Sequence, residues 1–251
     1  AVMDYIAARK QEPKYVGHPF SKVSHEPISP FTLDQYVRTL KGFATWLREK
    51  RHTRVNVLKN LQRPKLPKLV IEPLTEVEIR RVFAAIDTRT AYGARNYAIL
   101  LLFLDTGLRC GELCGLKLED VHLEGKHCYV KVLGKGQKER IVYVGRRTHE
   151  ALLTYRTFVR ARHARNVTVN SFFLSQEGRT LTLGAIQQMM RDLGQAAGVP
   201  RLHPHLLRHT AATQYLVNGG DAISLQHRLG HSGLEMTNRY VHFASAQLAA
   251  I

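Results

Sequence analysis

The feature that most restricts the fold is a change of hydrophobic period between residues 121 and 144. In the segment VHLEGKHCYVKVLGKGQKERIVYV, apolar and polar residues alternate, which is typical of strands with one buried face. Turns are expected at Glu124-Gly125 and at Gly134–Gln137, so the segment predicts three short antiparallel strands. Because the rest of the chain has mostly helical patterning, the predicted fold class is mainly α with a small three-stranded antiparallel sheet (α+β).

Helical periodicity is predicted on both sides of these strands. Thr75 and Glu78 have the spacing of a capping box, which marks the start of a helix that extends to about Ile86. Arg109 and Glu112 open another short helix after the Thr106-Gly107 stop. The remaining helices are expected at 55–61, 94–104, 148–163, 183–197, 205–217, 222–229, 234–240 and 244–251, with a short strand at Phe172-Phe173.

The first quarter or so of the chain, residues 1–69, is predicted to form a small basic domain. Residues 1–30 contain four prolines and are expected to be extended or irregular. Thr32 and Gln35 resemble a capping box at the start of the helix that follows. Its apolar stripe consists of Tyr36, Leu40, Phe43 and Leu47. Its opposite, cationic face carries Arg38, Lys41 and Arg48. Residues 1–69 hold 14 Lys+Arg against 5 Asp+Glu, so we predict that this face contacts DNA, although a solvated surface is the common alternative.

The chain is expected to have two domains. Prolines 64, 67 and 73 break regular structure in PKLPKLVIEP, which is typical of a linker. The predicted division is an N-terminal helical DNA-binding domain at 1–66, a linker at 67–73 and a larger domain at 74–251. Two basic lobes joined by such a linker can close around a duplex.

Composition narrows the class of partner. The chain has 37 Lys+Arg against 20 Asp+Glu, a formal net charge of +17, which favours a polyanionic partner such as nucleic acid. The longest apolar stretch, 98–104, is too short to span a bilayer, so no membrane role is expected. Three cysteines without a CxxC pair favour buried thiols in a reducing compartment over disulfides or a metal site.

Six residues carry the chemistry that this sequence offers. They are Arg109, Lys135, His205, Arg208, His231 and Tyr240, in the contexts TGLRCGEL, LGKGQKER, HPHLLRHT and LGHSGLEMTNRY. Phosphodiester transfer needs a nucleophile, a proton acceptor, positive charge on the phosphorane and a proton for the leaving alkoxide. Two guanidinium groups can grip phosphate oxygens, and a histidine three residues before an arginine shares its helical face. A lysine between two glycines at a hairpin tip can reach into a cleft. Each of these residues could instead be an ordinary surface or core residue without a catalytic role.

The order, contexts and spacing of these residues resemble the catalytic domain of the tyrosine recombinases, the lambda-integrase-like site-specific DNA recombinases. The resemblance extends from about Leu74 to Tyr240. It implies a tyrosine-recombinase-like catalytic domain after a small DNA-binding domain, in a cytoplasmic protein of bacterial, archaeal or phage origin. Compared with the family, residues 1–63 are short for the DNA-clasping domain, so we expect some N-terminal sequence to be absent.

The resemblance also implies roles for the residues. Tyr240 would attack DNA and form a 3′-phosphotyrosyl link, and Lys135 would protonate the 5′-oxygen that leaves. The two arginines, with His205 and His231, would stabilise the transition state. Apart from the resemblance, we expect Lys138 and Arg140 to contact backbone phosphates. Four protomers would assemble on two sites of double-stranded DNA, with the tail after Tyr240 packing on a neighbour. No cofactor, metal or nucleotide is expected, since one phosphoester replaces another.

Two other functions use parts of the same sequence. A type IB topoisomerase-like nicking–closing enzyme needs much the same residues, and a non-catalytic DNA-binding protein needs only the charge. The target DNA sequence, the biological role in integration, transposition or dimer resolution, and the accessory proteins do not follow from the sequence.

Overall fold

The chain divides into two compact units, Ala1–Val70 and Ile71–Ile251, and each is described by itself. The computed structural model describes residues 2–16, 24, 26–67, 71–125, 127–134, 138–163, 169–231, 233, 236–238, 240–241 and 243–244.

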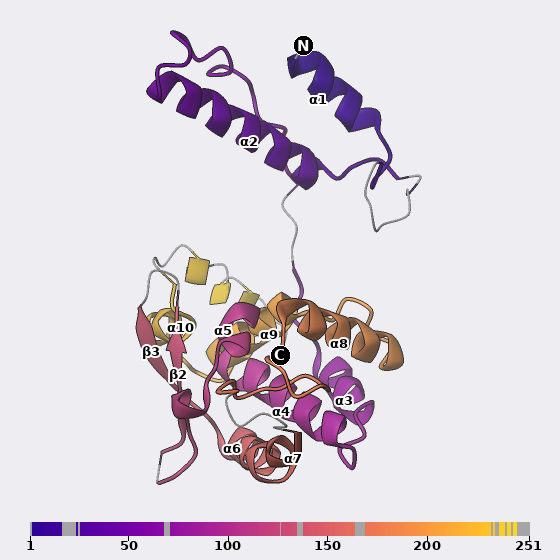
Figure 1. Cartoon of the computed structure of the whole chain (residues 1–251), viewed down its shortest axis with the longest axis vertical. Helices are drawn as coiled ribbons and strands as arrows, with labels where there is room; N and C mark the ends of the chain where they lie inside the picture. Colours follow the sequence, from indigo (N-terminus) through magenta and orange to yellow (C-terminus); the bar gives the residue numbers. More distant parts are fainter. Residues whose placement is uncertain are drawn as a thin grey trace. The chain divides into compact units, whose positions relative to one another are not determined.

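The first unit contains two helices, α1 (Val2–Gln11) and α2 (Pro30–Glu49), shown in Figure 1. The prediction that residues 1–30 lack regular structure is wrong for Val2–Gln11. The prolines begin only at Pro13, so nothing before that residue interrupts a helix.

Helix α2 starts earlier than the predicted capping box. The Ser29 hydroxyl accepts a hydrogen bond from the Thr32 N–H at 3.1 Å, and Pro30 occupies the first helical turn. Proline fits there because its missing N–H would have no helical partner. The predicted cap at Thr32 and Gln35 is therefore wrong by one turn.

The apolar face of α2 is also shifted from the predicted stripe. Leu33, Val37 and Ala44 are buried, whereas Phe43 is 56% exposed. The Phe43 ring stacks on exposed Trp46, with 5.8 Å between ring centroids. Capping the helix at Ser29 does not change its periodicity. The predicted and observed buried faces therefore differ because the neighbouring segments of the chain cover a different face of α2.

Residues 55–61, predicted as a short helix, form turns instead. The Asn56 side-chain oxygen accepts the Leu58 N–H at 3.0 Å, and its amide nitrogen donates to the Thr45 hydroxyl at 3.1 Å. An asparagine that bonds the backbone two residues on offers the chain an alternative to helical hydrogen bonds.

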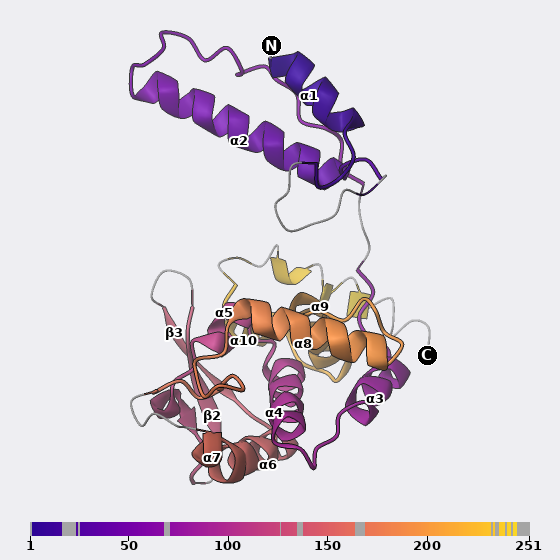
Figure 2. The same ribbon diagram turned by 45° about the vertical axis from the view of Figure 1, so that its right-hand side comes forward.

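The second unit is mainly helical and contains one small sheet (Figures 1 and 2). Its helices are α3 (Glu76–Ala84), α4 (Ala91–Thr106), α5 (Cys110–Cys114), α6 (Arg146–Thr154), α7 (Ala161–His163), α8 (Leu183–Ala196), α9 (Pro204–Val217) and α10 (Ala222–Leu229), with a 3₁₀ turn at Leu118–Asp120 and a π-helix at Tyr155–Arg160. Residues 236–238, 240–241 and 243–244 are also helical. The predicted capping box at the start of α3 is confirmed, since Thr75 and Glu78 bond each other's backbone N–H groups.

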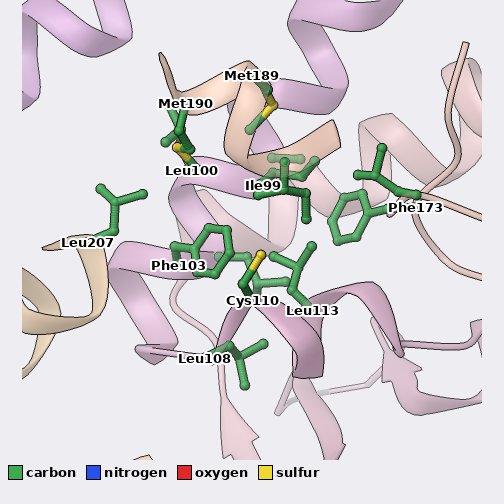
Figure 3. Close-up of a cluster of buried hydrophobic side chains, with 14 of the residues drawn as sticks. Ile99, Leu100, Phe103, Leu108, Cys110, Leu113, Phe173, Met189, Met190 and Leu207 are labelled. Atoms are coloured by element: carbon green, nitrogen blue, oxygen red, sulfur yellow. The ribbon is translucent and has the colours of Figure 1, made fainter. Parts of the chain in front are cut away.

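The core of this unit is built around α4, which is apolar on nearly every side. In Figures 1 and 2, α4 runs through the middle of the unit, with α6 at one end and α9 at the other. Figure 3 shows its side chains Ile99, Leu100 and Phe103 lying between those of α5, α8 and α9. All three are fully buried. This core fixes α5 and α9, which carry the functional residues.

The predicted three-stranded antiparallel sheet is confirmed. Its strands are β1 (Val121–His122), β2 (Tyr129–Leu133) and β3 (Glu139–Tyr143), in the order β1-β2-β3. Val132 pairs with Arg140, so the Arg140 side chain is on the same face as the buried valines of the sheet. Strand β3 packs beside α10.

The short strand predicted at Phe172-Phe173 is wrong. Both rings are fully buried, and only isolated bridges at Ser171 and Leu174 flank them. Their packing against Tyr155 of the π-helix, rather than a ladder of hydrogen bonds, fixes this segment.

Buried arginines hold several loops by their carbonyl oxygens. Arg160 is 8% exposed and donates to the carbonyls of Val169, Ser171 and Phe172 at 2.7–3.2 Å. Arg95, equally buried, donates to the Leu174 carbonyl at 2.9 Å. A planar guanidinium suits this role because it presents five donors in a fixed fork.

Candidate functional site

The site begins where two helices end in left-handed glycines. Gly107 follows α4 with φ of 64°, and Gly230 follows α10 with φ of 65°. A Cβ at Gly107 would lie 2.6 Å from the Leu229 side chain, so the two turns approach too closely for any larger residue. Arg208 of α9 joins them, because it donates to the Gly107 carbonyl at 2.6 Å and to the Leu229 carbonyl at 2.9 Å.

A buried carboxylate holds two further arginines. Glu112 of α5 accepts hydrogen bonds from the Arg109 N–H at 2.8 Å and from the Arg109 guanidinium at 2.9 Å. The Arg140 guanidinium binds both Glu112 oxygens, at 2.9 and 2.8 Å, and donates to the Arg228 carbonyl at 2.9 Å. Glu112 therefore holds the Arg109 and Arg140 side chains in place.

Electrostatics keep Glu112 ionised despite its burial. Desolvation alone would raise the pKa of this carboxyl, but hydrogen bonds from Arg140 and Arg109 and the Arg140 charge lower it below its usual range. Arg109 also donates to the Gly230 carbonyl at 3.4 Å, next to the Leu229 carbonyl that Arg208 holds. The two guanidinium groups therefore grip consecutive carbonyls of one turn.

His231 follows that turn and contacts Arg208 directly. The Arg208 guanidinium lies 2.9 Å from His231 Nε2, and His231 Nδ1 lies 3.0 Å from the Thr237 hydroxyl. Burial and the charges of Arg208 and Arg109 lower the pKa of His231 to about 4, so the ring is neutral at pH 7. Burial and the Arg109 charge lower the pKa of Arg208 to about 10, which still leaves it charged at pH 7.

Tyr240 lies against this group within the same chain. Its ring is parallel to that of His231, with 6.1 Å between centroids and 12° between planes. The His209 ring of α9 meets Tyr240 edge-on at 5.0 Å. Tyr240 is half-buried and packs against the small buried cluster formed by Ala212, Leu225 and Leu229. The Tyr240 ring therefore lies beside His231, which contacts Arg208, and Tyr240 interacts electrostatically with Arg208.

For two of the six predicted residues, the structure shows no contact with the other four. His205 is exposed on α9, one turn before Arg208. Lys135 lies outside the described residues. Its neighbour Gly134 is described, and a Cβ there would be 3.9 Å from a Glu112 oxygen, so this end of the predicted hairpin tip adjoins the site.

The residues predicted to contact phosphate differ in whether their charged groups already bind other protein atoms. Lys138 and Arg48 are exposed. Arg38 donates to Asp34 at 2.8 Å, and the Lys41 ammonium donates to the carbonyls of Lys59 and Leu61 at 3.0 and 2.7 Å. Phosphate contacts by these residues and by Arg140 remain predictions.

Sequence reasoning missed two features of the site. Thr237 was not singled out, although it stands three residues before Tyr240 and so falls on the same helical face. The bonds of Arg140 to Glu112 were not predicted either, although strand alternation places the Arg140 side chain with the buried side chains of the sheet. Among the described residues there is no cluster of three or more histidine, cysteine or acidic residues arranged to hold a metal ion.

No helix in the described part of the chain is long and apolar enough to cross a membrane.

Comparison with known proteins assigns the chain to a family. Residues 72–247 match the model of the phage integrase family. Tyrosine recombinase XerC of Bacillus pumilus is 36% identical over 222 residues, covering 86% of this chain and 72% of the relative. Tyrosine recombinase XerD of Listeria innocua is 30% identical over 225 residues, covering 89% of this chain and 75% of the relative.

Solved structures agree. The crystal structure of XerA recombinase is 30% identical, with a TM-score of 0.61, covering 99% of this chain and 81% of that one. XerH recombinase bound to a palindromic difH substrate has the same fold, with a TM-score of 0.74 at 24% identity, covering 88% of this chain and 66% of that one. The chain therefore belongs to the phage integrase family and is an enzyme of the tyrosine recombinase class.

Proposed function

We propose that the chain is a site-specific recombinase that cuts and rejoins DNA through a 3′-phosphotyrosyl link to Tyr240. The observation that supports this most is convergence. Arg109, Arg208, His231 and Tyr240 come from segments up to 131 positions apart and lie in one cluster of contacts. A DNA-binding protein without catalysis would need the charge, but it would not need a phenol beside it.

The charge of the cluster suits a phosphodiester. Three guanidinium groups, on Arg109, Arg140 and Arg208, face one carboxylate, on Glu112, while His231 is neutral. Among the described residues of this partly buried cluster, two positive charges are therefore not balanced by a carboxylate. A scissile phosphate would neutralise one, and the second negative charge that develops on the phosphorane would neutralise the other.

The remaining steps need proton transfer. In the proposed reaction the Tyr240 hydroxyl loses its proton to solvent as its oxygen bonds to phosphorus. The 5′-oxygen leaves at the same time, and Lys135 supplies the proton that this oxygen takes up. His205 and His231 complete the hydrogen bonds to phosphate. The 5′-hydroxyl of a partner strand then attacks the phosphotyrosine, so the phosphoester is conserved and the reaction uses neither metal nor ATP.

The partner that we propose is double-stranded DNA with specific recombination sites. XerH recombinase is described as bound to a palindromic difH substrate, and a lambda integrase dimer as bound to a COC′ core site. This chain shares their fold and carries a net charge of +17. Residues 1–66 would serve as the DNA-binding domain. A homo-tetramer on two sites, in the cytoplasm, is the assembly that strand exchange between two duplexes requires.

A nicked suicide substrate tests the nucleophile. Wild type should give a covalent protein–DNA adduct, and Tyr240→Phe should give none. Tyr215→Phe is the matched control, because Tyr215 packs in the same small apolar cluster and should keep the adduct. An adduct that survives in Tyr240→Phe would refute the proposal. Recombinant products from a two-site substrate distinguish exchange from topoisomerase activity, which would give relaxed circles alone.

A 5′-bridging phosphorothioate tests the acid. Its thiolate leaves without needing a proton, so it should restore cleavage to Lys135→Ala but not to Arg109→Ala. Equal restoration of both variants, or of neither, would remove Lys135 from this role.

A further inference from the structure

Helix α2 ends in a turn that usually contains glycine. The His52 N–H donates to the Leu47 carbonyl at 2.8 Å, and the Arg51 N–H donates to the Arg48 carbonyl at 3.0 Å. These two hydrogen bonds define a Schellman motif, in which the residue after the cap has a left-handed backbone. Arg51 is that residue, with φ of 61°. Because a Cβ in this conformation approaches the following carbonyl oxygen, Arg51 destabilises the turn relative to glycine.

The dipole of α2 does not explain why an arginine is at this position. Cations near the C-terminal end of a helix interact favourably with its last carbonyls, and the effect is confined to the last turn. Arg48 and Lys50 already supply this interaction from ordinary backbone conformations. Unfavourable backbone conformations that a fold retains are concentrated at functional sites. The Arg51 side chain therefore needs a role outside the helix itself.

The cations around Arg51 are exposed to solvent. Residues 48–54, the basic turn, contain four Lys+Arg against one Glu. In the described part of the chain, none of the four cationic side chains has a hydrogen bond or an ion pair; they are Arg48, Lys50, Arg51 and Arg54. By contrast, Arg38 on the same helix pairs with Asp34, and the Lys41 ammonium binds two carbonyls. The basic turn therefore offers positive charge that Arg38 and Lys41 do not.

Aromatic rings hold the basic turn against α2. The Trp46 ring is 46% exposed and stacks on Phe43, with 5.8 Å between centroids, and the His52 ring of the basic turn lies 5.4 Å from it. Because the His52 N–H also binds the Leu47 carbonyl, both the backbone and a side chain fix the turn. A surface that is already ordered in the free protein loses little conformational freedom when it binds a partner.

We propose that the basic turn is a contact site for the phosphate backbone of double-stranded DNA, and that Arg51 binds a phosphate there. A partner for four cations on one turn must carry several negative charges close together. Duplex DNA does so, with one negative charge for about every 1.7 Å of helix axis. Contacts of this kind set the affinity and the position on the duplex without reading its sequence. The choice of DNA as the partner rests on the proposed function.

Three substitutions in the full chain separate this role from a structural one. Arg51→Gly removes the charge and also relieves the backbone, so its effects on binding and on stability should have opposite signs. Arg51→Lys keeps a positive charge at the same place. Lys10→Gln is the matched control, because it removes one exposed charge from α1. Arg9 beside it donates to the Tyr36 hydroxyl at 3.0 Å, so the end of α1 lies beside the first half of α2, roughly 20 Å of helix from the basic turn (Figures 1 and 2).

The measurement is equilibrium binding of a short labelled DNA duplex of arbitrary sequence, by fluorescence anisotropy, over a range of salt concentrations. Wild type, Arg51→Lys and Lys10→Gln should share one affinity and one slope of log affinity against log salt. Arg51→Gly should bind about five-fold more weakly at about 0.15 M salt, with a slope smaller by about 0.9, as expected for the loss of one phosphate contact. Its melting temperature in calorimetry should be higher than that of wild type, because glycine adopts the left-handed conformation readily.

Trp46 reports on the same contact directly, because it is the only tryptophan of the chain. Its ring adjoins His52 of the basic turn, so saturating duplex should protect its fluorescence from quenching by acrylamide. Tyr240→Phe should show the same protection, since this contact does not involve the nucleophile.

Binding of Arg51→Gly with the affinity and slope of wild type would overturn the proposal, as would an equal loss in Lys10→Gln or an unprotected Trp46. Weaker binding of Arg51→Gly together with a lower melting temperature would show a structural role for Arg51 and remove the phosphate contact. Failure of the proposed function gives a different result, because wild type would then form no adduct with the suicide substrate while the duplex-binding results stayed as described.

Discussion

Replacing Glu112 by glutamine should destabilise the second unit more than any surface charge change. The Glu112 side chain is 6% exposed and accepts four hydrogen bonds from Arg109 and Arg140, all between 2.8 and 2.9 Å. A glutamine has the same shape, but its NH₂ would face two of these donors. It would also leave the guanidinium groups of Arg109, Arg140 and Arg208 without a negative charge.

The magnitude follows from the burial of the pair. Arg140 is 13% exposed and Glu112 6%, so solvent screens their interaction weakly. Removing one partner of a buried ion pair costs roughly 3–5 kcal/mol. For a unit of this size, each kcal/mol lowers the melting temperature by about 2–4 °C, so a fall of about 10 °C is expected.

Thermal unfolding of the full chain by calorimetry checks this prediction. Glu139→Gln is the control, because it makes the same change of charge on β3, where Glu139 is 56% exposed and pairs with Lys131 at 2.9 Å. An exposed pair of this kind contributes about 1 kcal/mol or less. If Glu112→Gln and Glu139→Gln melt at the same temperature, the Glu112 cluster does not hold the site together.

Three other changes test the site and its surroundings. Burial lowers the pKa of His231 to about 4, so the folded histidine binds its proton more weakly than an unfolded one. The free energy of unfolding should therefore be constant above pH 7 and fall by about 2 kcal/mol by pH 5. In chemical denaturation, His231→Gln should lack this pH-dependent fall. Gly230→Ala should cost about 1–2 kcal/mol, since φ is 65° and its Cβ would lie 3.0 Å from the Arg140 guanidinium, while Gly233→Ala, with open space around it, should cost less in the same assay. Arg160→Met should lower stability by about 3 kcal/mol because it leaves buried carbonyls without donors, and a wild-type urea midpoint would contradict this.

Local rules predicted the parts of the fold that depend on few residues. The capping box of Thr75 and Glu78 needs only its own helical turn, and Gly107 ends α4 because only glycine adopts its backbone conformation readily. The alternation of apolar and polar residues between Val121 and Tyr143 predicted three strands, because it too depends only on residues close together in the sequence. Strand alternation would also have shown that Arg140 turns inward, had it been applied to charged as well as apolar residues.

Tertiary contacts decided what the sequence left open. Phe43 belongs to an apolar stripe, yet the chain packs on the neighbouring face of α2, where Leu33 and Val37 lie. The approach of Gly107 to Leu229 joins helices more than 100 residues apart, and no local pattern encodes it. The motifs identified Arg208 and His231, but only the fold shows that they bond each other.

The arginines that hold loop carbonyls alter what ionic strength will reveal about DNA affinity. The logarithm of the affinity falls with the logarithm of salt concentration by about 0.9 for each phosphate neutralised, because each releases a counterion. A guanidinium such as that of Arg160, 8% exposed and committed to main-chain oxygens, releases none. Titrations in salt should therefore count fewer ionic contacts than the tally of basic side chains, and loss of binding after an arginine deletion will often report a loosened loop instead of a lost phosphate.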